Sequence, residues 1–143
     1  MNDGRIPAVT DFIFVDDDPV NNLICRLTVE LVWKGVPSES FVNSELALDH
    51  LKTSYPTKKN REHTVLLLDI NMPGMNGWEF LEGFDNLPVL TKEQVHIYIL
   101  SSSVDHRDKD RSYANKNVVG FLLKPLSIEC VQKFSDDWTG KIN

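Results

Sequence analysis

Nearly continuous apolar runs alternate along the chain with segments whose apolar residues lie three or four positions apart. Four strong runs occupy residues 12–15, 65–68, 95–100 and 118–123, and a weaker one occupies residues 40–42. Continuous runs of this length are typical of strands covered by helices on both faces, whereas half-exposed strands alternate apolar with polar residues. The pattern therefore predicts five strand–helix units around a buried parallel sheet.

Helical spacing is clearest in the segment after the first strand. Asp18 is suited to cap a helix and Pro19 to its first position. The helix is predicted to bury its apolar stripe, formed by Val20, Ile24, Leu27 and Leu31. A second helix is predicted to start at Asn43 or Ser44 and to bury Ala47, Leu48 and Leu51.

Two further helices are predicted, together with two weaker segments. The third helix follows Gly77 and carries Trp78, Phe80, Leu81 and Phe84. The last is capped by Ser127 and has an apolar stripe of Ile128, Val131, Phe134 and Trp138. Residues 105–116 are nearly all polar, so we expect this segment to be loosely held, with Tyr113 and Ala114 as its anchors. Residues 52–64, which contain Pro56 and several charges, are predicted to form a surface loop.

Composition limits the classes of function. The chain has 143 residues, of which 41% are hydrophobic and 25% charged, as in an average soluble globular domain. We expect one domain over residues 1–143, with a core of about residues 10–139 and no output module. The net charge of −6 opposes direct binding to nucleic acid. The chain lacks the pattern of a signal peptide or a membrane span, so we expect a cytoplasmic location and no membrane partner. Cys25 and Cys130 have no metal-site spacing and are expected to be reduced, semi-buried thiols.

Acidic residues follow two of the predicted strands directly. Asp16, Asp17 and Asp18 come after the first strand, and Asp69 comes after the third. The carboxyl ends of parallel strands form one edge of the sheet, where ligands bind in open α/β folds. Carboxylates about 4 Å apart repel by roughly 4 kcal/mol at an effective dielectric near 20, so the group requires a cation. Oxygen ligands without a calcium-binding loop favour Mg²⁺. Asp18 is better explained as the cap of the following helix than as a ligand.

A hydroxyl and an ammonium group end the remaining strands. Ser101 follows the fourth strand, and Lys124, before Pro125, follows the fifth. Alone, Ser101 would be a turn hydroxyl and Lys124 a surface charge. Together at the edge that holds Asp69, they and a metal ion could neutralise three phosphoryl oxygens.

Three sequence blocks resemble the signatures of response-regulator receiver domains. They are F-I-F-V-D-D-D-P, V-L-L-L-D-I-N-M-P-G-M-N-G and G-F-L-L-K-P, and they occur in order over almost the entire chain. The resemblance implies a flavodoxin-like (βα)5 fold with strand order 2-1-3-4-5. It also implies transfer of a phosphoryl group from a sensor histidine kinase or a histidine phosphotransfer protein. The second block taken alone is also what any tight strand-to-helix connection would use.

The resemblance assigns a role to each matching position. It makes Asp69 the phosphoacceptor, Asp17 a direct ligand of Mg²⁺ (or of Mn²⁺ in its place) and Asp16 a ligand through water. Asn71 would contribute its backbone carbonyl to the metal. Lys124 would pair with the phosphoryl group, next to a cis bond to Pro125. The switch residues would be Ser101, where Thr is more common in the family, and Phe121, which lacks the hydroxyl of the more common Tyr. The signalling surface would comprise strands four and five and the two helices that flank strand five. The phosphoryl lifetime would vary with residues such as Asn71 and Ser103.

Two alternatives remain open on sequence alone. Asp16-x-Asp18 has the spacing of the nucleophile and acid of haloacid-dehalogenase-type phosphatases. However, Pro19 follows where that family has Gly-Thr, no cap domain fits, and Asp69 is left unexplained. The second alternative is a pseudo-receiver that binds proteins without being phosphorylated, against which the complete acidic set, Ser101 and Lys124 argue.

Overall fold

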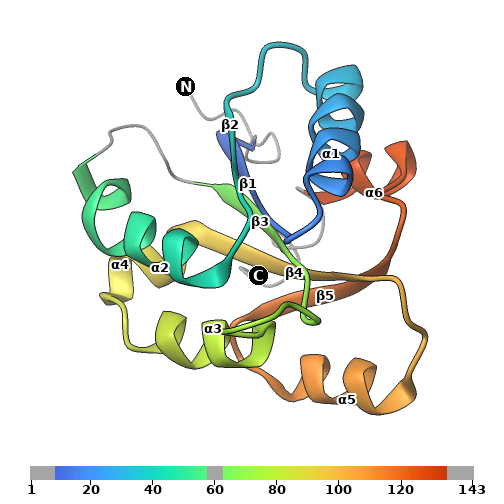
Figure 1. Ribbon diagram of the computed structural model, residues 1–143. Helices are drawn as coiled ribbons and strands as arrows, with labels where there is room; N and C mark the ends of the chain where they lie inside the picture. The colour runs from blue at the N-terminus through green and yellow to red at the C-terminus, as the bar shows by residue number, and fades with distance from the viewer. Residues whose placement is uncertain (1–8, 58–62, 135–143) are drawn as a thin grey trace.

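The computed structural model describes residues 9–57 and 63–134, which form a five-stranded parallel sheet between helices (Figure 1). The strand order is β2-β1-β3-β4-β5, which confirms the predicted flavodoxin-like (βα)5 topology. The strands are β1 (Asp11–Val15), β2 (Ser38–Phe41), β3 (Thr64–Leu68), β4 (Val95–Ser101) and β5 (Val118–Leu123). The weak second strand is thus confirmed, although it begins two residues before the predicted start.

The helices follow the predicted order with one addition. The described residues contain α1 (Pro19–Val32), α2 (Ser44–Thr53), α3 (Gly77–Asp85), α4 (Val89–Gln94), α5 (His106–Ala114) and α6 (Ile128–Gln132). The unpredicted helix is α4. It is six residues long, starts after Pro88 without a side-chain cap, and exposes Val89 and Leu90. A helix this short, without a cap or a buried stripe, leaves little signal in the sequence.

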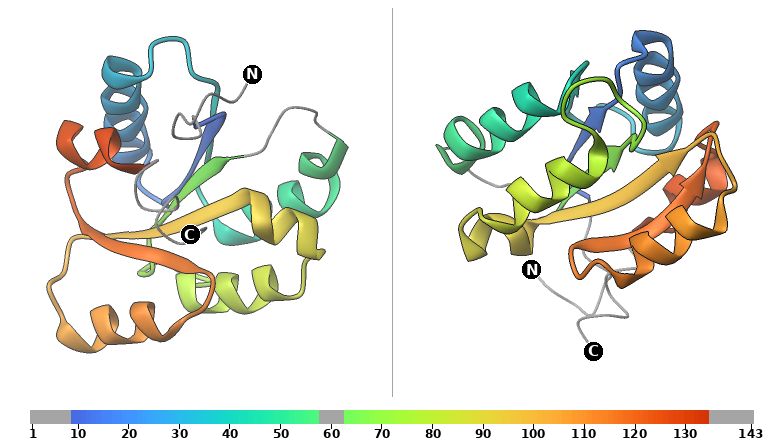
Figure 2. Two further views of the ribbon diagram at one scale, coloured as in Figure 1. Left: turned by 180° about the vertical axis from the view of Figure 1, so that it is seen from behind. Right: turned by 60° about the horizontal axis from the view of Figure 1, so that its bottom comes forward.

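Two hydrophobic cores lie on opposite faces of the sheet. Helices α1 and α6 cover one face, and α2 and α3 cover the other (Figures 1 and 2). Strands β1 and β3 are fully buried and β4 nearly so, as their continuous apolar runs require, whereas the edge strands β2 and β5 are only partly buried. Successive residues of β5 divide between the two layers, because Phe121 packs against the α2–α3 core and Leu122 against the α1–α6 core.

The predicted inner face of α1 is wrong. The predicted stripe faces solvent, with Val20 61% and Leu31 74% exposed, and Leu23, Ile24 and Leu27 are also exposed. The buried residues are instead Asn21, Asn22, Cys25 and Val29. The two asparagines turn inward because both donate hydrogen bonds to Asp16. The hydrogen bonds to the buried carboxylate and backbone carbonyl of Asp16 therefore stabilise this orientation of α1 more than burial of the wider apolar stripe would stabilise the opposite one.

Two other expectations need correction. Residues 52–64 are not simply a surface loop: a 3₁₀ helix, η1 (Tyr55–Thr57), buries Tyr55, whose hydroxyl lies 2.7 Å from Thr64 Oγ1. Residues 105–116 contain the regular helix α5, but Tyr113 is 58% exposed and Ala114 is exposed too. The buried residue of α5 is Ser112, and the Arg111 guanidinium lies 4.3 Å above the Trp78 ring of α3.

The remaining structural expectations fare better, except that Ile128 of the stripe predicted for α6 is 42% exposed, while Val131 and Phe134 of that stripe are buried. Asp18 accepts a hydrogen bond from Val20 N and caps α1, while Asn43 and Ser127 cap α2 and α6. Cys25 and Cys130 are free thiols, and burial raises the pKa of Cys25 to about 12. Trp138 lies outside the described residues. In the part of the chain that the structure describes, no helix has the length and apolar character needed to cross a membrane.

Candidate functional site

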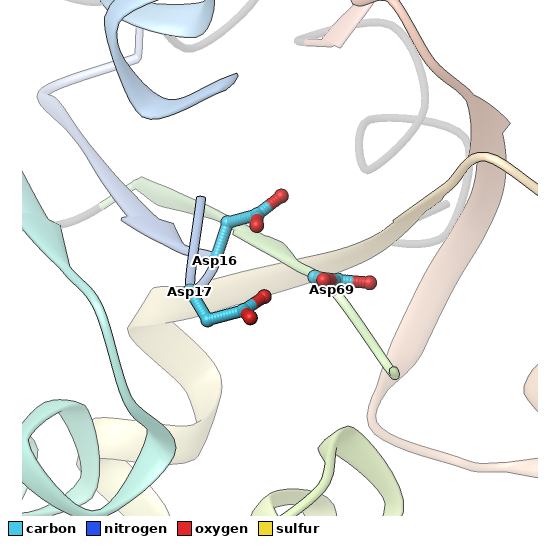
Figure 3. A group of neighbouring side chains, drawn as sticks. All are labelled: Asp16, Asp17 and Asp69. Atoms are coloured by element: carbon cyan, nitrogen blue, oxygen red, sulfur yellow. The ribbon is translucent and has the colours of Figure 1, made fainter. Parts of the chain in front are cut away.

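Three carboxylates converge at the carboxyl end of the sheet. Asp16 and Asp17 follow β1, Asp69 follows β3, and one oxygen from each lies within 4.8 Å of the others (Figure 3). Backbone pairing continues one residue beyond the strands, because Asp16 N donates to Phe41 O (3.1 Å) and Asp69 N donates to Val15 O (2.9 Å). The parallel sheet therefore brings together the acidic residues that the sequence predicts to meet.

Asp16 is the most firmly held of the three carboxylates. It is 3% exposed, and its Oδ1 accepts a hydrogen bond from Asp18 N (2.8 Å). Its Oδ2 is shared by Asn21 Nδ2 (2.8 Å) and Lys124 Nζ (2.7 Å). Three donors on one carboxylate fix its orientation and satisfy its charge. Asp17, by contrast, is exposed to solvent.

Asp69 is buried with less support. It is 7% exposed, its Oδ1 accepts from Asn71 N (3.1 Å), and its Oδ2 lies 3.8 Å from Lys124 Nζ. Burial is the main cause that raises the pKa of Asp69 to about 6, and the charges of Asp16 and Asp17 add to it. The Asn71 hydrogen bond and Lys124 act in the opposite direction. A buried carboxylate beside two others is thus poorly compensated by the protein alone.

Lys124 is the ammonium group that faces this cluster. Burial acts to lower its pKa, but the hydrogen bond to Asp16 and the charge of Asp69 outweigh that effect and raise it. The Lys124–Pro125 peptide bond is cis, as the resemblance implies, and Lys124 N donates to Ser101 O (2.8 Å). Ser101 is fully buried, and its Oγ accepts from Ser103 N (3.0 Å).

The loop after Asp69 is shaped by two glycines. Gly74 has φ +72°, a conformation that favours glycine. Gly77 starts α3 against the site, where a Cβ would lie 2.6 Å from Ile70 Cα and 2.9 Å from Asp69 O. The second sequence block thus holds α3 close to the backbone of Asp69.

Comparison with known proteins identifies the family. The response regulator receiver domain matches residues 12–134 of the chain. The chain belongs to this family. A receiver protein from Dyadobacter fermentans is 29% identical over 90% of this chain and 97% of its own, with a TM-score of 0.80. A two-component response regulator from Cytophaga hutchinsonii is 25% identical over 96% and 99%, with a TM-score of 0.74. One from Legionella pneumophila is 26% identical over 91% and 98%, with a TM-score of 0.72. Among curated protein sequences, none matches significantly.

The donor set of this receiver domain fits a hard divalent cation. Receiver domains bind Mg²⁺ through an acidic cluster, and Asp16, Asp17 and Asp69 form such a cluster here. Three carboxylates face one ammonium group, so negative charge remains in excess, and all candidate ligands are oxygens. The carbonyl of Asn71 as a further ligand stays a prediction. The phosphatase alternative loses its general acid, because Asp18 caps α1.

Sequence reasoning missed two residues of this receiver domain. Asn21 binds the carboxylate of Asp16, and Asn22 Nδ2 donates to the Asp16 backbone carbonyl (3.0 Å). The sequence does carry a signal for them, because two adjacent asparagines lie in the first turn of a helix that also has an apolar stripe. This signal can be interpreted only when the first strand is known to end next to Asp16, because the first turn of α1 then packs beside Asp16.

Proposed function

We propose that this receiver domain accepts a phosphoryl group on Asp69 from a phosphohistidine of a histidine kinase or phosphotransfer protein, in a Mg²⁺-dependent reaction. The observation that carries the proposal is the position of Asp69. Its buried carboxylate lies beside Asp16, Asp17 and Lys124 at one edge of the sheet.

Each residue has a defined part in the transfer. An oxygen of Asp69 forms a bond to phosphorus while the bond from phosphorus to the donor imidazole breaks, and the electron pair of that bond returns to the imidazole nitrogen. Asn71 N, which donates to Asp69 Oδ1, orients the carboxylate. Lys124 turns from the carboxylates to a phosphoryl oxygen. Asp17 and Asp69 would hold Mg²⁺ directly and Asp16 through water, and the cation would supply positive charge that offsets the repulsion between the carboxylates and the phosphoryl group.

The signalling step of the proposal uses Ser101 and Phe121. The Ser101 hydroxyl moves to a phosphoryl oxygen, and Phe121 turns inward. The free energy gained from a few new charge-assisted hydrogen bonds is similar to the free-energy difference between the two states of such an element. These bonds therefore suffice to shift it from one state to the other. The surface affected comprises β4, α5, β5 and α6. In support, Phe121 lines a groove of about 600 Å³ together with Val104, His106, Lys109, Leu123 and Cys130.

The outward face of α1 supports a docking site for the phosphodonor. Its exposed apolar residues, Val20, Leu23, Ile24, Leu27 and Leu31, begin directly beyond the acidic cluster. Contiguous exposed apolar residues of this kind mark protein interaction sites. An apolar helix face next to the donor histidine would cover them while the histidine reaches Asp69.

Phosphorylation is tested with acetyl phosphate and Mg²⁺. Wild type and an Asp49→Asn control, which changes an exposed carboxylate of α2, should form an acid-stable, base-labile phosphoprotein, whereas Asp69→Asn should form none. Beryllofluoride with Mg²⁺ should change the fluorescence of Trp78, whose ring lies against Arg111 of α5. A labelled Asp69→Asn variant would contradict the assignment. A wild type that takes no label and shows no fluorescence change would favour the pseudo-receiver.

A further inference from the structure

The carboxylate of Asp16 has two donors on the same oxygen. Lys124 Nζ lies 2.7 Å and Asn21 Nδ2 lies 2.8 Å from Asp16 Oδ2. Asp16 is 3% exposed and Asn21 is also buried, so bulk solvent has little access to this oxygen. One donor is an ammonium group at the end of a long side chain on the loop after β5, and the other is a neutral amide on α1.

Lys124 is placed unequally between its two carboxylates. Its Nζ lies 3.8 Å from Asp69 Oδ2, more than 1 Å further than from Asp16 Oδ2. If the ammonium group moves toward Asp69 to pair with a phosphoryl oxygen there, its contact with Asp16 lengthens. A buried carboxylate oxygen that loses its partner carries a desolvation penalty, which would oppose the movement of Lys124.

We propose that Asn21 is a positioning residue that keeps Asp16 Oδ2 hydrogen-bonded when Lys124 turns to the phosphoryl group on Asp69. The inference rests on the proposed function for the transfer itself. Without Asn21, the Lys124–Asp16 pair would be the sole contact of that oxygen among the donors described here, and it would hold the lysine back. With Asn21 present, Lys124 can leave Asp16 and pair with the phosphoryl group on Asp69.

The local structure holds the Asn21 amide in the required orientation. The capped first turn of α1 places Asn21 beside the end of β1, and the Asn21 amide also contacts Cys25 Sγ (3.8 Å), one turn along the helix. Asn22 fixes the same turn through the Asp16 carbonyl. A neutral amide supplies a hydrogen bond without adding a second positive charge that would compete with the cation.

A double-mutant cycle on thermal stability tests the shared oxygen directly. Asn21→Leu removes the amide donor at similar volume, Lys124→Met removes the ammonium donor, and the melting temperatures of both single variants and the double variant are measured in chelator. Each single variant leaves Asp16 Oδ2 with one donor, whereas the double variant leaves it with neither. The loss in the double variant should therefore exceed the sum of the single losses by about 3 °C or more. Additive losses would overturn the proposal, and Asn21→Ala repeats the cycle if leucine does not fit.

A second measurement links the shared oxygen to phosphotransfer. The Asn21→Leu variant should bind Mg²⁺ within about twofold of wild type but bind beryllofluoride about tenfold more weakly, the scale of one hydrogen bond to a charged group. Val29→Ala, which opens a cavity under the same helix, should lower the melting temperature without changing either affinity. Equal beryllofluoride affinities of Asn21→Leu and wild type would overturn the role of Asn21 while the proposed function stands. If wild type does not bind beryllofluoride, both the proposed function and the role of Asn21 in it are overturned. The thermal cycle would then still measure how strongly Asn21 and Lys124 together hold Asp16.

Discussion

Replacing Asp69 with Asn should stabilise this receiver domain in the absence of divalent cations. Burial, with help from Asp16 and Asp17, raises the pKa of Asp69 from 3.8 to about 6. When the pKa of a carboxyl is higher in the folded than in the unfolded protein, the carboxyl stabilises the fold at pH values below its unfolded pKa. That contribution is lost as the pH rises through its folded pKa. At neutral pH the ionised Asp69 is therefore a net cost to folding, which the neutral amide avoids.

The size of the effect follows from the pKa. A rise from 3.8 to about 6 corresponds to about 3 kcal/mol at 1.36 kcal/mol for each unit. Solvent at the rim of the cluster screens part of this, so we expect a gain of about 1–2 kcal/mol. For a domain of this size that gain raises the melting temperature by roughly 5 °C. The Oδ1 of asparagine can still accept the hydrogen bond from Asn71 N, so little is lost in exchange.

Thermal unfolding in chelator, followed by circular dichroism between pH 4 and 8, measures the effect. The gain of Asp69→Asn over wild type should be full above pH 7 and disappear towards pH 4, where Asp69 is protonated. Mg²⁺ should raise the melting temperature of wild type more than that of the variant, because it offsets the same repulsion. The Asp49→Asn control should show no pH-dependent gain. A variant no more stable than wild type at pH 7.5, or equally stabilised at pH 4, would refute the reasoning.

Two further predictions follow from the geometry. Gly77→Ala should destabilise the domain by about 1–3 kcal/mol in denaturant unfolding, because its Cβ would lie 2.6 Å from Ile70 Cα; unchanged stability would show that α3 can move away from the site. Leu27→Asp on the exposed face of α1 should reduce phosphotransfer from a cognate kinase at least about tenfold, as expected for an interface anchor. The same variant should leave the rate with acetyl phosphate unchanged, so an equal loss with both donors would exclude a docking role.

The strands and the residues that follow them were predictable from sequence. A parallel strand buried on both faces gives a continuous apolar run, and a run that stops at an acidic residue shows where the strand reaches the sheet edge. Asp16, Asp69, Ser101 and Lys124 are therefore predictable neighbours at one edge of the sheet. The cap at Asp18 was predictable for a similar reason, because its signal lies within a few residues.

Features that depend on contacts between elements were not predictable. The apolar stripe of α1 indicated the wrong inner face, because hydrophobic periodicity does not include the hydrogen bonds of Asn21 and Asn22 to Asp16. Helix α5 likewise has no apolar anchor in its own sequence. It is held in part by Arg111 above Trp78, a pair separated by more than thirty positions in the chain and visible only in the fold.

The division of β5 between two cores has a consequence for how such domains diversify. Phe121 and Leu122 are neighbours in the chain, yet one belongs to the layer of α2 and α3 and the other to the layer of α1 and α6. The sheet separates the layers, so a substitution that reshapes one has few direct contacts with the other, and distant sites combine additively. If the proposed function holds, a substitution beside Phe121 would therefore alter the proposed switch while leaving the packing under α1, where the phosphodonor is proposed to dock, largely unchanged.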